Sequence, residues 1–110
     1  MPPETDNIAV TDNEIASQFE VQVDGNTALL TYKRMGKSIV LNHIEVPVAL
    51  EGRGIASKLT RTALELARME HLEVLPVCPY VSGYLKKHAE YHDLLSEKNL
   101  KRLLENEKSS

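Results

Sequence analysis

In the segment Glu51-Gly52-Arg53-Gly54-Ile55-Ala56, small residues stand at the start of a helical pattern of apolar residues. A helix start of this kind can bind an anion. The first turn of a helix leaves four backbone N–H groups unpaired, and the helix dipole makes that end partly positive. Small residues let a phosphate approach these groups. No Ser, Thr, Asp or Asn lies within residues 51–54 to cap the helix. The segment is therefore either a phosphate-binding helix start or a tight turn.

The spacing of these glycines excludes two common nucleotide sites. The segment is not Gly-x-x-x-x-Gly-Lys-Ser/Thr, and it lacks the third glycine of the dinucleotide fingerprint. A second basic feature is Lys86-Lys87-His88, which is either a solvated helix face or a contact for a ligand phosphate. The nearby tyrosines, Tyr84 among them, either pack half-buried or donate a proton to a leaving group.

His43 and Glu45 form a candidate acid–base pair. Residues two apart share one face of a regular strand, so both are expected on the face of Ile39 and Leu41, where an apolar core face opens into a pocket. Partial burial there suits a general base. A bulge before Pro47 would change which side chain points inward, and the alternative is a solvent-facing edge.

Cys78 is the single cysteine of the chain and lies in Val77-Cys78-Pro79-Tyr80-Val81. A free cysteine is most often a small buried hydrophobe. The alternative is a thiol in a crevice beside a helix N-terminus. No group of residues has the spacing of a metal site, so we expect none.

The hydrophobic period predicts the elements that position these residues. Residues 1–17 are polar and acidic and are expected to form a loose tail. Alternation and turn residues then predict an antiparallel meander, and a 3.6-residue period predicts helices. The expected strands are residues 19–23, 28–32, 38–46 and 72–77, and the expected helices are residues 54–70, 81–95 and 96–107.

The strand–helix–strand unit over residues 38–77 predicts a parallel crossover. Both strands then end beside the N-terminus of the helix, which is the usual ligand crevice of such a unit. Residues 43–47, 51–56 and 78–81 should converge there. The predicted fold class is α+β: a meander, a β-α-β crossover and C-terminal helices. One domain is expected over residues 18–95, followed by a last helix and a frayed end over residues 96–110.

The composition limits the class of protein. The chain has 110 residues and a net charge of -3, which argues against a broad nucleic-acid surface. One cysteine excludes an internal disulfide framework and suits a reducing compartment. No signal peptide or membrane span is visible, so we expect a cytoplasmic protein without membrane or nucleic-acid partners, as a monomer or a weak dimer.

The order of these motifs resembles the GNAT superfamily of acetyl-CoA-dependent N-acetyltransferases. The superfamily pattern Gln/Arg-x-x-Gly-x-Gly/Ala matches at Gly54 and Ala56, with Glu51 in the first position. The small YjdJ-type GNAT-like proteins are more similar still. Residues 43–47, 52–56 and 78–81 carry this resemblance, together with His88-Ala89-Glu90-Tyr91, which has Ala89 where proline is usual.

The resemblance implies acetyl-CoA, or coenzyme A, as the ligand. Its pyrophosphate would bind the backbone of Gly52, Arg53, Gly54, Ile55 and Ala56, with Lys87 and His88 nearby. The pantetheine arm would pair with backbone near Ile44 and Val46, and Cys78 would lie near the acetyl end. The chain has no room for the extra helices that build an acceptor pocket in larger members. An open acceptor site for a small molecule or a protein is therefore expected.

Three functions are compatible with these residues. The first is an N-acetyltransferase, in which an unidentified amine attacks the thioester directly with Glu45 or His43 as base, or Cys78 accepts the acetyl group first. The second is a CoA-binding module without turnover, acting as a sensor or partner protein. The third is a Cys/His hydrolase built from Cys78 with His43 or His88, which lacks an orienting third residue.

Overall fold

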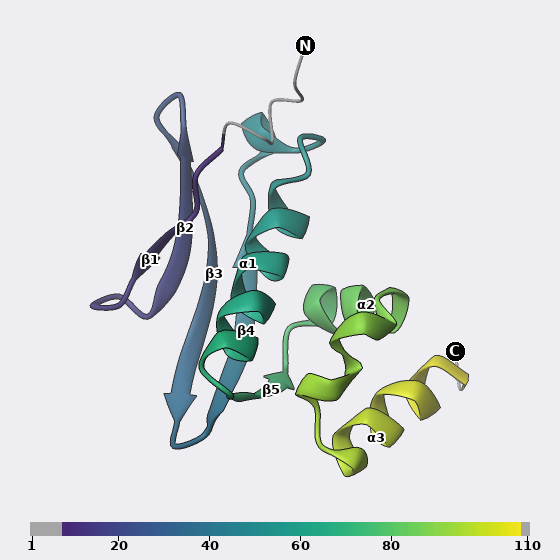
Figure 1. Cartoon of the computed structure of the whole chain (residues 1–110). Helices are drawn as coiled ribbons and strands as arrows, with labels where there is room; N and C mark the ends of the chain where they lie inside the picture. Colours follow the sequence, from purple (N-terminus) through teal and green to yellow (C-terminus); the bar gives the residue numbers. More distant parts are fainter. Residues whose placement is uncertain (1–7, 109–110) are drawn as a thin grey trace.

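The computed structural model describes residues 8–108, with side chains to residue 105 (Figure 1). Five strands form one sheet in the order β1-β2-β3-β4-β5. They are β1 (Thr11–Asn13), β2 (Gln18–Val23), β3 (Asn26–Met35), β4 (Ser38–Glu45) and β5 (Glu73–Pro76). The first four are antiparallel neighbours, whereas β5 runs parallel to β4. The predicted meander, the parallel crossover and the α+β class are confirmed.

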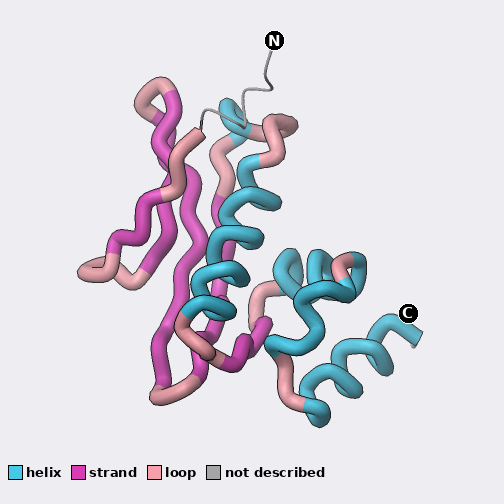
Figure 2. The backbone as a smooth tube through the Cα atoms, viewed as in Figure 1, coloured by secondary structure: helices cyan, strands magenta, loops and turns pink. Residues whose placement is uncertain are grey.

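The helices lie on one face of this sheet and beside its β5 edge (Figure 1). They are η2 (Val48–Leu50), α1 (Ile55–Met69), α2 (Pro79–Lys87), η3 (Ala89–Leu94) and α3 (Glu97–Lys108). Figure 2 shows α1 lying along the sheet, while the later helices gather beside β5. Helix α1 contacts β2 to β5. The other face of β2 to β4 carries exposed polar side chains, including Gln22, Thr27 and Lys33.

The core lies between α1 and the sheet. Alternation puts one side chain in two on the covered face, and the 3.6-residue period turns one stripe of α1 toward it. Each large apolar side chain buried this way contributes roughly 1.5–3 kcal/mol. The side chains exposed by 1% or less include Phe19, Val21, Leu30, Ile39, Leu41, Ile55, Leu59 and Leu64. This core fixes where α1 begins relative to the end of β4.

The loose tail expected over residues 1–17 is wrong at residues 11–13. Thr11–Asn13 form β1, whose partners on β2 are Glu20, Phe19 and Gln18. Asp12 accepts a 2.6 Å hydrogen bond from the Tyr32 hydroxyl. These long-range bonds order a polar segment that has no apolar period of its own. Residues 1–7 of the expected tail lie outside the described residues.

The helix expected over residues 81–95 is two helices. Helix α2 ends at Lys87, because His88 has φ -129° and ψ 79°, outside the helical region. The chain continues as the 3-10 helix η3. This break turns Tyr91 toward α1, where its hydroxyl donates to Glu65 at 2.6 Å. The final helix is present as α3, one residue later than predicted at each end.

Within residues 8–108, no helix is long and apolar enough to cross a bilayer. Across the same residues, no three His, Cys, Asp or Glu side chains gather closely enough to hold a metal ion.

Candidate functional site

The N-terminus of α1 presents backbone donors without a side-chain cap. Gly54 is the residue that begins the helix, with φ 74° and ψ 18°, and no side chain caps it. Gly52 also has a positive φ of 81°. Glycine adopts this left-handed conformation without the strain that a Cβ atom imposes. The two glycines therefore let the loop turn sharply into α1 and keep its first N–H groups uncovered.

These donors open into a continuous groove, here named the glycine-loop groove. A hollow of about 250 Å³ adjoins the helix start, and a second of about 340 Å³ shares Ser57 and Tyr80 with it. The first is lined by Val46, Leu50, Glu51, Gly52, Gly54, Ile55, Ala56, Ser57 and Tyr80. The second adds Pro79, Gly83, Tyr84, Lys87 and His88. The structure thus brings the end of β4, the glycine loop and the start of α2 together, as the sequence predicts.

Strands β4 and β5 separate beside this groove. Leu41 and Pro76 are their last paired residues. The Leu41 carbonyl oxygen then accepts hydrogen bonds from the N–H groups of Val77 at 3.1 Å and Cys78 at 2.9 Å. Beyond this point, residues 43–45 pair with β3 alone among the described strands. These residues therefore have no strand partner on the side of β4 that faces β5, and Val46, just beyond them, lines the groove.

A bulge overturns the predicted direction of His43 and Glu45. Thr31 pairs with His43 and Tyr32 with Leu41, so Asn42 is an extra residue in β4. An extra residue reverses the side-chain alternation that follows it. Ile44 consequently packs against the core, while His43 and Glu45 lie on the sheet face opposite α1.

His43 and Glu45 form an exposed pair rather than the floor of a pocket. The His43 Nε2 and Glu45 Oε1 atoms are 3.6 Å apart, and the side chains are 62% and 67% exposed. Thr31 donates a 3.4 Å hydrogen bond to the His43 carbonyl. An imidazole next to a carboxylate can accept and hold a proton. The pair is accessible to a solute that approaches the uncovered face.

Cys78 is buried, with 2% of its surface exposed, at the residue preceding α2. Its carbonyl oxygen accepts from Ser82 N at 3.0 Å, and its N–H bonds to Leu41. Buried placement agrees with the packing interpretation of the lone thiol. The described contacts join neither His43 nor His88 to this thiol, so the geometry does not support the hydrolase.

The far wall of the groove is held by aromatic stacking. The rings of Tyr84 and His88 stack with centroids 3.8 Å apart, and His88 Nδ1 lies 2.8 Å from the Tyr84 carbonyl oxygen. A carbonyl oxygen only accepts, so Nδ1 carries the proton of this bond. Tyr91 lies behind Tyr84, with centroids 6.3 Å apart. Lys87 and His88 line the groove, whereas Lys86 does not.

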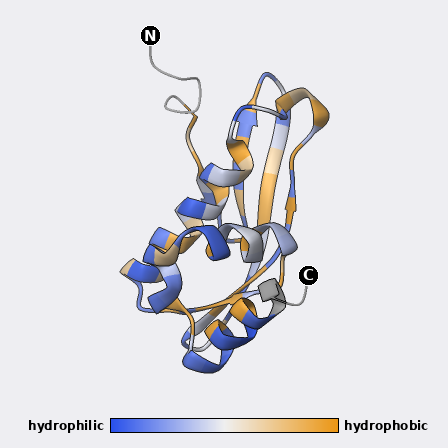
Figure 3. Cartoon of the chain, turned by 90° about the vertical axis from the view of Figure 1, so that its right-hand side faces the viewer, coloured by the Kyte–Doolittle hydropathy of each residue, from blue (hydrophilic) through white to orange (hydrophobic). Residues whose placement is uncertain are grey.

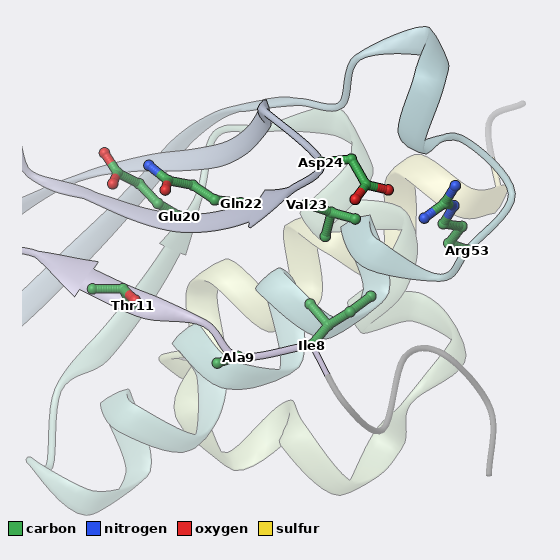
Figure 4. A pocket seen from close by; sticks show the side chains of 8 residues that line it. All are labelled: Ile8, Ala9, Thr11, Glu20, Gln22, Val23, Asp24 and Arg53. Carbon is green, nitrogen blue, oxygen red and sulfur yellow. The ribbon is translucent and has the colours of Figure 1, made fainter.

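The side chain of Arg53 leaves the loop on the other side. It lines a separate hollow of about 760 Å³ with Glu20, Gln22 and Asp24 (Figure 4). Figure 4 shows the Arg53 side chain projecting on the side where Asp24 lies. The Arg53 side chain therefore does not line the glycine-loop groove, and the predicted contact there is one of its backbone alone.

Several groove residues, among them Ser57, Tyr80 and Gly83, are not predicted as ligand contacts from the sequence. Ser57 and Tyr80 join the two hollows, and Gly83 lines the second. Burial raises the pKa of Tyr80 above its ordinary value. Ser57 lies one helical turn after Gly54, so helix periodicity would have placed it on the groove side.

Comparison with known proteins agrees with this arrangement. The GCN5-related N-acetyltransferase family model matches residues 18–94. Protein NATD1 of Mus musculus is 42% identical over 74 residues, covering 64% of this chain and 67% of that protein. Protein NATD1 of Xenopus tropicalis is 36% identical over 85 residues, covering 74% and 78%.

A solved structure shares the fold. The NMR solution structure of a GCN5-like protein from Staphylococcus aureus superposes with a TM-score of 0.65 at 27% identity, over 82% of this chain and 89% of that one. The family match covers β2 to β5, the glycine loop, α1, α2 and η3. This chain is therefore a member of the GCN5-related N-acetyltransferase family.

Proposed function

We propose that this protein transfers the acetyl group of acetyl-CoA to an amine. The observation that carries the proposal is the uncapped N-terminus of α1. It opens into the glycine-loop groove at the place where β4 and β5 separate. An anion suits the N–H groups of such a helix end, and the separated strands give a neighbouring channel with unpaired backbone.

The residues present fit acetyl-CoA at both ends of the groove. The backbone N–H groups from Gly52 to Ala56 suit the pyrophosphate, since small residues leave them accessible. Lys87 and His88 line the continuation of the groove and suit a further phosphate. The β4 backbone near Ile44 and Val46 suits the amide-bearing arm. When bound, acetyl-CoA supplies an acetyl group activated as a thioester.

The His43–Glu45 pair supplies the base. An amine in water carries an extra proton, and the neutral amine is the nucleophile. His43 accepts that proton, and Glu45 stabilises the resulting imidazolium across 3.6 Å. The amine nitrogen would then bond to the acetyl carbon and release its second proton to water, while the carbon–sulfur bond breaks and the leaving thiolate takes one proton. Tyr84, which lines the groove, is the donor we assign to that thiolate.

The burial of Cys78 favours direct attack. A nucleophilic thiol must reach the acetyl carbon, and this side chain is 2% exposed. The exposed His43–Glu45 pair lies on the opposite face, where an incoming amine has access. We therefore assign Cys78 to packing beside the acetyl end and not to an acyl-enzyme.

Two strained glycine variants test the cofactor site. Gly54→Val places a side chain at the helix start, and we expect calorimetric binding of acetyl-CoA to be lost. Gly36→Val is the matched control, because Gly36 also has a positive φ, of 61°, but lies in the β3–β4 turn far from the groove. If Gly54→Val binds acetyl-CoA as tightly as Gly36→Val does, the glycine-loop groove is not the acetyl-CoA site. Binding without thiol release, across a panel of amines, would identify a binding module instead.

A further inference from the structure

A further hollow lies between β5, α2 and α3, and is here named the α3 hollow. It has a volume of about 250 Å³. Its walls are residues 75–77 along β5, Ser82 of α2, and Asn99, Arg102 and Leu103 of α3. None of these residues lines the glycine-loop groove.

The α3 hollow adjoins the place where the acetyl group would lie. Residues 75–77 lead directly into Cys78, whose N–H bonds to Leu41 at the point where β4 and β5 separate. Val77 lies between the separation point and the hollow, and it is 63% exposed. A molecule that reaches the separated strands can therefore extend across Val77 into the hollow.

The walls of the α3 hollow combine apolar surface with one positive charge. Leu75, Val77 and Leu103 are apolar. The Ser82 hydroxyl donates a 3.0 Å hydrogen bond to the Pro76 carbonyl oxygen. Arg102 forms no hydrogen bond or ion pair with the side chains described up to residue 105. A guanidinium binds a carboxylate with two parallel hydrogen bonds. The chemistry is that of a site for an apolar chain ending in a carboxylate.

Helix α3 is held firmly enough to act as a wall. The Ser96 hydroxyl accepts from the Asn99 N–H at 3.2 Å and so caps the helix start. Asn99 Nδ2 donates to Glu73 of β5 at 3.2 Å, and Leu103 is 6% exposed. Figure 3 shows this C-terminal helix as largely hydrophilic, with hydrophobic residues set among the polar ones.

Helix α3 also lies beyond the family match. That match ends at residue 94, and α3 begins at Glu97. Arg102 and Asn99 are thus outside the part of the chain that resembles the GCN5-related N-acetyltransferases. The sequence predicts an open acceptor site, and the α3 hollow has one wall formed by α3.

We propose that the α3 hollow binds the body of the acceptor, and that the acceptor is a small amine whose apolar chain separates the amine from a carboxylate bound by Arg102. This rests on the acetyl transfer proposed above. Because β5 lies between the separation point and the hollow, and strands lie about 4.8 Å apart, amine and carboxylate must be at least that far apart. A five-carbon chain spans roughly 6 Å and satisfies this.

Three matched amines test the substrate class. They are 6-aminohexanoic acid, its amide 6-aminohexanamide, and hexylamine, assayed by thiol release from acetyl-CoA. We expect kcat/KM for the acid to exceed that for the amide by roughly ten-fold, as a charge-assisted bond allows. Arg102→Ala should remove this preference, so that kcat/KM for the acid falls to that for the amide. The matched control, Lys101→Ala on the exposed side of α3, should keep it.

A binding experiment separates this proposal from the acetyl transfer. Without acetyl-CoA, 6-aminohexanoic acid should shift the amide signals of Val77, Ser82 and Asn99 in the wild-type protein and not in Arg102→Ala. Absence of these shifts at millimolar ligand overturns the α3 hollow as a site. Equal rates with acid and amide, or a preference that survives Arg102→Ala, also overturn it. Failure of acetyl-CoA binding with these shifts present overturns the acetyl transfer alone.

Discussion

The backbone N–H of Cys78 donates a 2.9 Å hydrogen bond to the carbonyl oxygen of Leu41, and no described residues of β4 and β5 pair beyond it. This bond marks where the strands separate. Three features meet around it: the glycine-loop groove on the α1 side, the His43–Glu45 pair on the opposite face, and the α3 hollow beyond Val77. The proposed acetyl transfer depends on these three features lying around one separation point.

Replacing the base should lower the rate of transfer at neutral pH. We expect His43→Ala to reduce kcat by about 100-fold, within the usual contribution of a general base, and Glu45→Gln to reduce it less. The reduction in kcat relative to the wild-type protein should become smaller at alkaline pH, because the amine is already neutral there. Glu14→Gln, at an exposed site before β2, is the control. If both substitutions leave the pH–rate profile unchanged, neither residue is the base.

Removing the thiol should leave transfer intact. Cys78 is buried and assigned to packing, so Cys78→Ala should keep kcat within about three-fold and cost about 1 kcal/mol of stability through the small cavity. Thiol release and urea unfolding measure the two effects. A folded Cys78→Ala protein without activity would instead support an acetyl-cysteine intermediate.

Two buried tyrosines provide a matched comparison for the far wall of the groove. Tyr91 and Tyr32 each donate a 2.6 Å hydrogen bond to a carboxylate, on Glu65 and Asp12 respectively. Each Tyr→Phe change should destabilise the fold by roughly 1–2 kcal/mol. Tyr91 alone contacts Tyr84, so only Tyr91→Phe should weaken acetyl-CoA binding, by roughly three- to ten-fold. Equal dissociation constants for the two variants would contradict this positioning role.

The same two tyrosines predict how stability falls at alkaline pH. Burial and the carboxylate hydrogen bond raise the pKa of Tyr32 and of Tyr91 from 10.0 to about 12. Between these values the unfolded chain has lost a proton that the folded protein keeps, so stability decreases as pH rises. Each tyrosine contributes a slope of about 1.4 kcal/mol per pH unit. Urea unfolding from pH 9 to 11.5 should show a shallower slope for either Phe variant.

Local sequence patterns predict the glycine-loop groove. The features that the sequence does not reveal depend on contacts between residues that are far apart in the chain. The 3.6-residue period and the uncapped glycines predicted α1 and its open N-terminus. The bulge at Asn42 leaves no mark in residues 38–46, so His43 and Glu45 were assigned to the wrong face. The break at His88 interrupts an apolar period that continues to Leu94, and the contact of Tyr91 with Glu65 accompanies it.

Titration of acetyl-CoA into the protein, followed by backbone amide signals in NMR, tests the central claim most directly. We predict saturable shifts from Gly52 to Ala56 and at Cys78, with smaller shifts at Lys87 and His88. The amides near Gly36 should not move. No saturable shift at millimolar acetyl-CoA, or shifts confined to residues outside the glycine-loop groove, would contradict the assignment of this groove as the acetyl-CoA site.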